Sequence, residues 1–268
     1  KQNSRGSPSI PAPRIHMKLR CRFMKSSGNR EYRCDFHIHS CLSPCGSDDM
    51  TPNNLVNMAA LSGCEIIALT DHNTCRNTPA AVRAGEEAGI LVIPGMELCT
   101  AEEAHVVCLF ETISGALEFG DYIMAHMPHV KNKPEIFGEQ RILDEEDQLL
   151  GLEENLLLVS SFVGINEVLN LTEQYGGTAF PAHVDRDSYS VIASLGAIPP
   201  EAGFTAAEVT RGCDMEAYRQ EHPELSGLLI LRDSDSHYLE TLADEPGFLQ
   251  LEDRSTAAVL KKLRSRLG

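Results

Sequence analysis

The sequence of 268 residues predicts an α/β protein in which about seven strands form a barrel-like sheet. Two observations predict this fold class. Short apolar runs with strand character recur along the chain, and helical patterns lie between many of them, an alternation typical of parallel βα units. The predicted strands also lead, one after another, into histidine or acidic side chains. Barrels of parallel strands assemble their active sites from such strand ends.

The first 33 residues do not take part in this alternation. Residues 1–33 are rich in Ser, Pro and Arg, show no hydrophobic period, and carry nine Lys or Arg side chains against one acid, Glu31. We expect a disordered basic arm, because such a segment cannot bury enough apolar surface to order itself. The arm could bind an acidic partner or act as a targeting peptide. Met17 and Met24 leave open that it precedes the natural start.

Seven runs from Tyr32 onwards have the length and composition of strands. They span residues 32–38, 66–70, 90–94, 105–110, 178–182, 206–210 and 228–232. Four helices are expected between and after them. Thr51 and Pro52 supply an N-cap and a first-turn proline for a helix that ends at Gly63. The other helices span residues 79–88, 165–175 and 255–266.

One long segment interrupts the alternation. Residues 111–164 are acidic and mostly helical in pattern, with a break around residues 131–134 and no convincing βα unit. We expect a helical insertion or lid over the mouth of the barrel, since connecting segments often carry function. A long irregular excursion is the alternative.

Composition argues against several classes of protein. No apolar run approaches the roughly 20 residues that span a bilayer, so we expect no membrane partner, and no secretory signal pattern is seen. The nine cysteines are scattered, mostly in apolar segments, which favours free thiols in a reducing cytoplasm. Residues 34–268 carry a charge balance of −24. We therefore expect no long nucleic acid as a partner unless bound cations offset this charge.

The segment from Asp35 to His39 holds the first candidate metal ligands. Side chains alternate along a strand, so His37 and His39 are expected on one side, with Phe36 and Ile38 on the other. Two imidazoles on one side of a strand end are suitable metal ligands.

Later strands add further candidates. Acidic or histidine side chains follow the predicted strands at Asp71, His72, Glu97, His183, Asp235 and His237. His105 opens its strand instead, but a tight reversal through residues 101–104 could bring it beside Glu97. Asp71 is expected to orient a ligand and not to bind metal itself. Together these positions predict a metal centre at the strand ends.

The motifs DFHIHS, TDHNT, PGMEL, a downstream His105, PAHVDR and SDSH occur in this order between about Tyr32 and His237. This series resembles the PHP (polymerase and histidinol phosphatase) superfamily, and more closely its stand-alone phosphoesterase branch. The resemblance implies that residues 34–268 form a distorted (β/α)7 barrel, with the helical insertion at residues 111–164. It also implies two or three divalent metal ions, commonly manganese, zinc or iron, and hydrolysis of phosphate esters.

The resemblance implies His, Asp and Glu ligands for three metals. The ligands of the first would be His37, His39, Glu97 and Asp235; those of the second Glu97, His105 and His183; those of the third His72, His237 and a residue of the loop after His39.

That loop departs from the pattern of the family. Many relatives carry Asp or His five or six residues after the second histidine, where this sequence has Pro44 and Cys45. We choose Asp48 as the loop ligand because carboxylates suit manganese. A Cys45 thiolate would favour zinc or iron.

A catalytic mechanism follows from metal chemistry. Metals bridged by Glu97, with Asp235 on the first, would lower the pKa of a shared water from 15.7 to about 7 for attack on phosphorus. Arg186 is expected to contact the phosphate, with a surface arginine as the alternative. The expected substrate is a small phosphorylated molecule, possibly a nucleotide. A metal-dependent amide or lactone hydrolase and a non-catalytic metal- or nucleotide-sensing module are the competing functions.

Overall fold

The computed structural model describes residues 29–243 and 246–266, so residues 1–28 of the expected arm lie outside the described residues. Residues 30–33, which we assigned to the arm, instead begin strand β1 (Arg30–Ile38). They pair antiparallel with β10 (Gly247–Leu251), a strand we did not expect. Tyr32 is buried there, and this pairing with a distant segment extends β1 beyond its apolar run.

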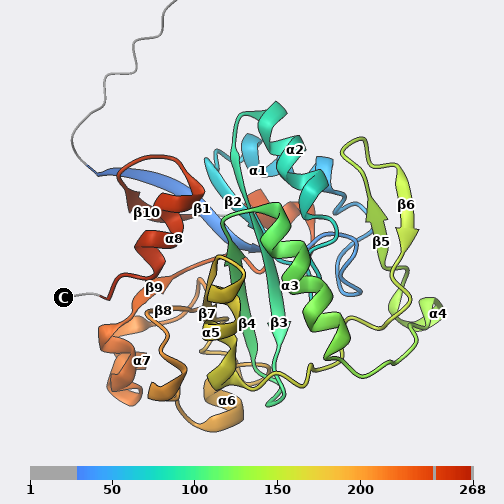
Figure 1. The fold of residues 1–268 in the computed structure, drawn as a ribbon. Coiled ribbons are helices and arrows are strands. Elements are labelled where there is room, and N and C mark those ends of the chain that lie inside the picture. The colour runs from blue at the N-terminus through green and yellow to red at the C-terminus, as the bar shows by residue number, and fades with distance from the viewer. Residues whose placement is uncertain (1–28, 244–245, 267–268) are drawn as a thin grey trace, which may run out of the picture.

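Six strands form the main sheet in the order β10-β1-β2-β3-β4-β7 (Figure 1). Strands β2 (Ile66–Leu69), β3 (Leu91–Cys99), β4 (His105–Phe110) and β7 (Gly177–Pro181) follow β1 in this sheet. Strands β1, β2 and β3 are parallel, whereas β4 is antiparallel to β3 and β7. A tight hairpin, in which Glu103 has a φ of 61°, joins β3 to β4. The expected reversal through residues 101–104 is confirmed, and Cys99 pairs with His105.

Two further strands complete the ring. Strands β8 (Ala206–Glu208) and β9 (Leu229–Leu231) form a parallel pair. The Val184 amide, just after β7, donates to the Glu208 carbonyl at 2.8 Å, and Ile38 bridges Ser236 in parallel. Strands β1 to β4 and β7 to β9 thus make the distorted seven-stranded α/β barrel that the sequence predicted. Buried side chains from all seven strands fill it: Phe36, Ala68, Ile93, Val107, Phe180, Ala206 and Leu231.

All four predicted helices are confirmed, as α1 (Pro52–Leu61), α2 (Thr78–Ala88), α5 (Ile165–Gln174) and α8 (Thr256–Leu263). The Thr51 side chain caps α1 by accepting from the Asn54 amide, and Gly89 ends α2 with a left-handed φ of 78°. Shorter helices are α6 (Val191–Leu195), α7 (Met215–Glu221) and the 3-10 turns Pro200–Ala202, Pro223–Gly227 and Leu239–Ala243. Within the described residues, no helix has both the length and the apolar character needed to cross a membrane.

The segment 111–164 is only partly helical. Helix α3 (Ile113–Ala125) buries Ala116, Phe119 and Ile123 against the barrel, and α4 (Pro134–Phe137) is a single turn. A two-stranded hairpin, β5 (Arg141–Leu143) with β6 (Leu149–Leu152), follows at the side of the molecule (Figure 1). The acidic run 144–147 forms its turn, because the Asp144 carboxylate accepts from the Glu146 and Gln148 amides. The expectation of a helical insertion is therefore wrong over this hairpin.

Candidate metal centre

A buried carboxylate, Glu97, lies where the strand ends meet. Its side chain is 1% exposed. Its Oε1 lies 2.8 Å from His105 Nδ1 and 3.1 Å from His37 Nε2 and His183 Nε2, and its Oε2 lies 2.8 Å from His72 Nδ1 and 3.4 Å from His39 Nε2. Five imidazoles thus surround one carboxylate. They come from the end of β1, the loop after β2, the start of β4 and the segment after β7.

A second carboxylate joins this group from the segment after β9. Asp235 Oδ1 lies 3.4 Å from His37 Nε2 and 3.2 Å from His39 Nε2. The backbone of Asp235 is left-handed, with a φ of 49°, which fits a residue held in place by its surroundings.

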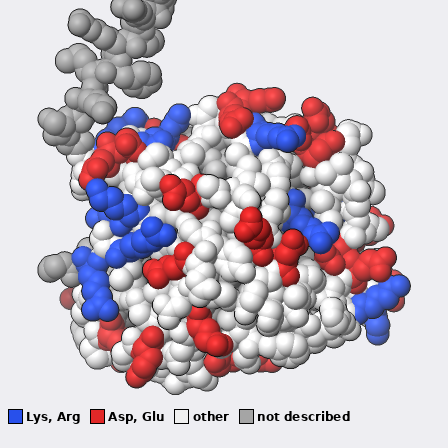
Figure 2. All heavy atoms as spheres, in the orientation of Figure 1, with Lys and Arg blue, Asp and Glu red and all other residues white. Residues whose placement is uncertain are grey.

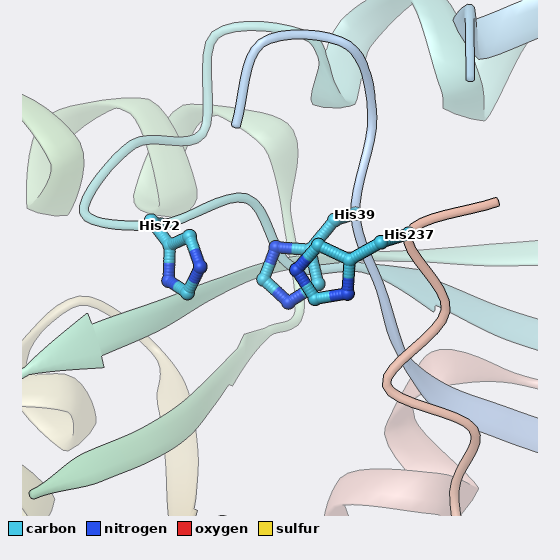
Figure 3. A group of neighbouring side chains, drawn as sticks. All are labelled: His39, His72 and His237. Carbon is cyan, nitrogen blue, oxygen red and sulfur yellow. The ribbon is translucent and has the colours of Figure 1, made fainter. Parts of the chain in front are cut away.

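Three imidazoles form a neighbouring group on the other side of His39. The ligand atoms of His39, His72 and His237 all lie within 4.8 Å of one another. Figure 3 shows that the three rings come from different segments: the end of β1, the loop after β2 and the segment after β9. The rings of His39 and His237 stack with centroids 4.2 Å apart.

The donor atoms of this centre suit divalent cations. Several of them are buried and make no hydrogen bond among the described residues: His37 Nε2, His39 Nε2, Glu97 Oε2 and Asp235 Oδ1. Leaving such groups unpaired costs free energy, and a cation among them would satisfy imidazole and carboxylate lone pairs together. Nitrogen and oxygen donors of this kind bind zinc, iron and manganese.

Electrostatics keep both carboxylates ionised. Burial acts to raise the pKa of Glu97, but His105, His37 and His72 outweigh it and hold that pKa well below its usual value. Burial also opposes ionisation of Asp235, yet the neighbouring His37 and the contact with His39 keep its pKa well below the usual range. The centre therefore offers two anionic ligands.

Polar side chains behind the centre hold the imidazoles. Glu208, a residue we did not predict, places its Oε2 2.7 Å from His37 Nδ1. Its one sequence signal is an acidic side chain within the apolar run of β8. Asp71 supports His39 through Ser43. Its carboxylate accepts from the Ser43 hydroxyl, whose oxygen lies 3.0 Å from His39 Nδ1. Such contacts fix the tautomer and the ring orientation of a metal ligand.

The structure does not bring Asp48 to the centre. Its side chain is 86% exposed and pairs with Arg141 at 2.8 Å. Cys45 instead lies where the ligand from this loop was expected, with its Sγ 3.2 Å from His72 Nε2. Successive turns, in which Ser43 donates to the Ser40 carbonyl and Gly46 to that of Ser43, fold the loop back at Cys45 and leave Asp48 to continue outward.

Arg186 lies at the centre. Its Nη1 is 2.6 Å from Asp235 Oδ2, while 43% of the side chain remains exposed. It lines a cavity of about 270 Å³ that opens over the histidines and whose rim includes Leu158 and Tyr189. Tyr189 is half-exposed, its ring stacks on that of His105 with centroids 5.0 Å apart, and its carbonyl accepts from the His105 amide.

Comparison with known proteins agrees with this architecture. The model of the PHP domain matches residues 35–194. An uncharacterized protein of Methanocaldococcus jannaschii is 30% identical over 117 residues, covering 36% of this chain and 68% of the relative. A 5'-3' exoribonuclease of Haemophilus influenzae is 36% identical over 78 residues, covering 28% of this chain and 27% of the enzyme.

Solved structures share the fold at low sequence identity. Endonuclease Q of Pyrococcus furiosus superposes with a TM-score of 0.65 at 15% identity, covering 88% of this chain and 56% of that one. A complex of endonuclease Q with a 27-mer duplex that carries an abasic lesion at the active site gives 0.62, also at 15% identity, covering 88% of this chain and 57% of that one. This chain therefore spans little more than half of the length of endonuclease Q.

The expectation that long nucleic acid is not a partner is wrong. It rested on net charge, and endonuclease Q, a protein that shares this fold, binds a 27-mer duplex substrate with an abasic lesion at its active site. Net charge is also a poor guide to the local surface. Lys and Arg side chains lie among Asp and Glu side chains over the face shown in Figure 2.

Replacing Glu208 with Gln should weaken metal binding by about 10–100-fold, because a neutral amide supports the His37 imidazole less well than a carboxylate. The measurement is competition for zinc or manganese against a chromophoric chelator, with circular dichroism to verify the fold. Glu201→Gln, at an exposed position, is the matched control and should bind metal like the parent. An unchanged affinity in Glu208→Gln would show that the contact with His37 is dispensable.

Proposed function

This chain belongs to the PHP domain family, and on that premise we propose that it is a metal-dependent hydrolase of phosphate esters that acts on nucleic acid strands or nucleotides. The observation that carries the proposal is the convergence of five imidazoles on the buried carboxylate of Glu97. In a purely structural metal site, protein ligands fill every coordination position, whereas a catalytic site keeps a position open for water or substrate. This one lies beneath an open cavity.

The resemblance to the PHP family implies how these ligands would be divided among the metals. The first metal would take His37, His39, Glu97 and Asp235; the second Glu97, His105 and His183; and the third His72 and His237. Manganese, zinc and iron all suit this set. When bound, such ions activate water and neutralise charge on phosphoryl oxygens.

The residues of the chain position the substrate. The guanidinium of Arg186 reaches the cavity beside Asp235, and its remaining N–H groups can donate to two oxygens of a phosphate in a fixed fork. Glu97 and Asp235 have lowered pKa values and would offer anionic ligands to the metals beside it.

The rim of the cavity suits a nucleobase. Tyr189 exposes one face of a ring that is held by His105, and Leu158 lies on the same cavity. Aromatic side chains of this kind stack on bases with little regard to sequence. The exoribonuclease and endonuclease Q named above support a nucleic acid as the substrate class.

We also propose a reducing, cytoplasmic location. The eight cysteines among the described residues are free thiols, and burial raises the pKa of several of them, such as Cys75 and Cys108. Buried thiols in this state are typical of proteins from reducing compartments.

The proposal is tested with a substrate panel in the presence of manganese. We expect release of phosphate or cleavage for a 5'-phosphorylated oligonucleotide, a mononucleotide or a duplex with an abasic site, and loss of activity after chelation. Glu97→Gln should remove turnover while the fold persists, because a neutral amide bridges metals poorly. Turnover of amides or lactones alone would make the chain a different metal-dependent hydrolase, and metal binding without any turnover would favour a sensing module.

Arg186→Ala should lower kcat/KM for a phosphoester by roughly tenfold to a thousandfold, about 1.4–4 kcal/mol, with metal content unchanged. Arg186→Lys should restore only part of this loss, since an ammonium lacks the planar fork. Steady-state kinetics and elemental analysis of the three proteins provide the measurement. Full activity in both variants would mean that the phosphate is held elsewhere.

Tyr189→Ala should raise KM for a nucleotide or oligonucleotide by about 5–150-fold, which corresponds to roughly 1–3 kcal/mol of base stacking. Glycerol phosphate has no base, so its KM should change little. Tyr189→Phe keeps the ring and serves as the matched control. Equal effects of Tyr189→Ala on both kinds of substrate would contradict a base-stacking role.

A further inference from the structure

A thiol lies beside the outer group of imidazoles. Cys45 Sγ is 3.2 Å from His72 Nε2, and Cys45 and His237 line the same cavity as His72. A sulfur and a nitrogen bound to one tetrahedral zinc, at about 2.3 Å and 2.0 Å, lie about 3.5 Å apart. The observed separation is therefore close to that of two ligands of one ion.

The imidazoles around this thiol are prepared to bind a cation. His237 Nδ1 lies 2.9 Å from the Asp235 carbonyl, a contact that leaves Nε2 as the ligand atom. His39 Nε2, in the same group, is fully buried and has no hydrogen-bond partner among the described residues. Neither observation involves the cysteine, and both favour cation binding at this group of imidazoles.

The backbone holds the cysteine in this place. The Ser47 amide donates to the His237 carbonyl at 2.9 Å, which joins the loop of Cys45 to the segment of His237. The loop also turns tightly at Gly46, where an added Cβ would lie 2.3 Å from the Ser40 carbonyl oxygen. Only glycine allows this close approach, so the position of Cys45 relative to His237 is built into the backbone.

We propose that the thiolate of Cys45 is a ligand of the third metal, together with His72 and His237, and that it makes this site prefer zinc or iron to manganese. The inference rests on the metal centre of the proposed function but not on its substrate. The metal replaces the thiol proton, which leaves to solvent, so that a sulfur–metal bond forms without any redox change. Cys45 is exposed, so both ion and proton have a path. A soft sulfur ligand favours zinc and iron.

Cobalt(II) is the probe for the thiolate. Metal-free protein loaded with cobalt should show a thiolate-to-cobalt charge-transfer band in the near ultraviolet, and Cys45→Ser should lose this band. Cys99→Ser is the matched control, because Cys99 is a second cysteine on the same cavity and should leave the band unchanged. Cys45→Asp should shift the preference of the site from zinc towards manganese in a competition titration.

A second measurement uses the unaltered protein. Bound zinc should slow alkylation of Cys45 by iodoacetamide at least about tenfold, read by mass spectrometry, while Cys213 keeps its rate. A band that survives Cys45→Ser, full cobalt loading without a band, or unchanged alkylation would each overturn the assignment. Neither readout uses turnover. Phosphoester cleavage without the band refutes the ligand alone, and the band without cleavage refutes the proposed function alone.

Discussion

The carboxylate of Glu97 is the constraint on which the rest of the centre depends. Burying an isolated carboxylate costs several kcal/mol, so the fold must bring compensating groups to it. The imidazoles of His37, His72, His105 and their neighbours do so from the ends of separate strands, and in turn they leave their own nitrogen lone pairs directed inward. As a result, several buried polar atoms of this site have no hydrogen-bond partner within the part of the chain that the structure describes. A cation bound among these atoms would satisfy their lone pairs and so contribute to the stability of the centre.

The reversal of β4 is the second element of this construction. In a regular parallel barrel, a residue that opens a strand lies at the end opposite the active site. The short hairpin between β3 and β4 turns β4 round, so that its first residue, His105, pairs with Cys99 and reaches Glu97. The barrel is distorted at the point where an additional ligand is needed.

Much of this arrangement could be predicted from local sequence. The spacing of apolar runs predicted the barrel strands, and the residues that follow each run predicted which side chains meet, because parallel strands end at a common mouth. Features that depend on distant pairing could not be predicted. Strand β10 exists through its pairing with β1, and Glu208 is recognisable as a support only once His37 lies beside it. The choice of Asp48 over Cys45 followed metal preference, whereas turns of the backbone determine which side chain faces inward.

Strict alternation also fails near His37. A register shift in β1 places Phe36 inside the barrel and Ile38 among the residues packed under α1 and α2, yet both histidines still reach the centre.

The bridge between Ile38 and Ser236 has a consequence for how the molecule is assembled. Phe36 and Asp233, whose amide and carboxylate meet at 2.8 Å at this seam, are 197 residues apart in sequence. Closure of so long a loop is slow, because its entropic cost precedes any contact that rewards it. During synthesis, a nascent chain therefore carries His37 and His39 long before Asp235 and His237 have left the ribosome. The complete set of ligands comes together only when the ring of strands has closed. The metal centre can therefore form only in the folded barrel.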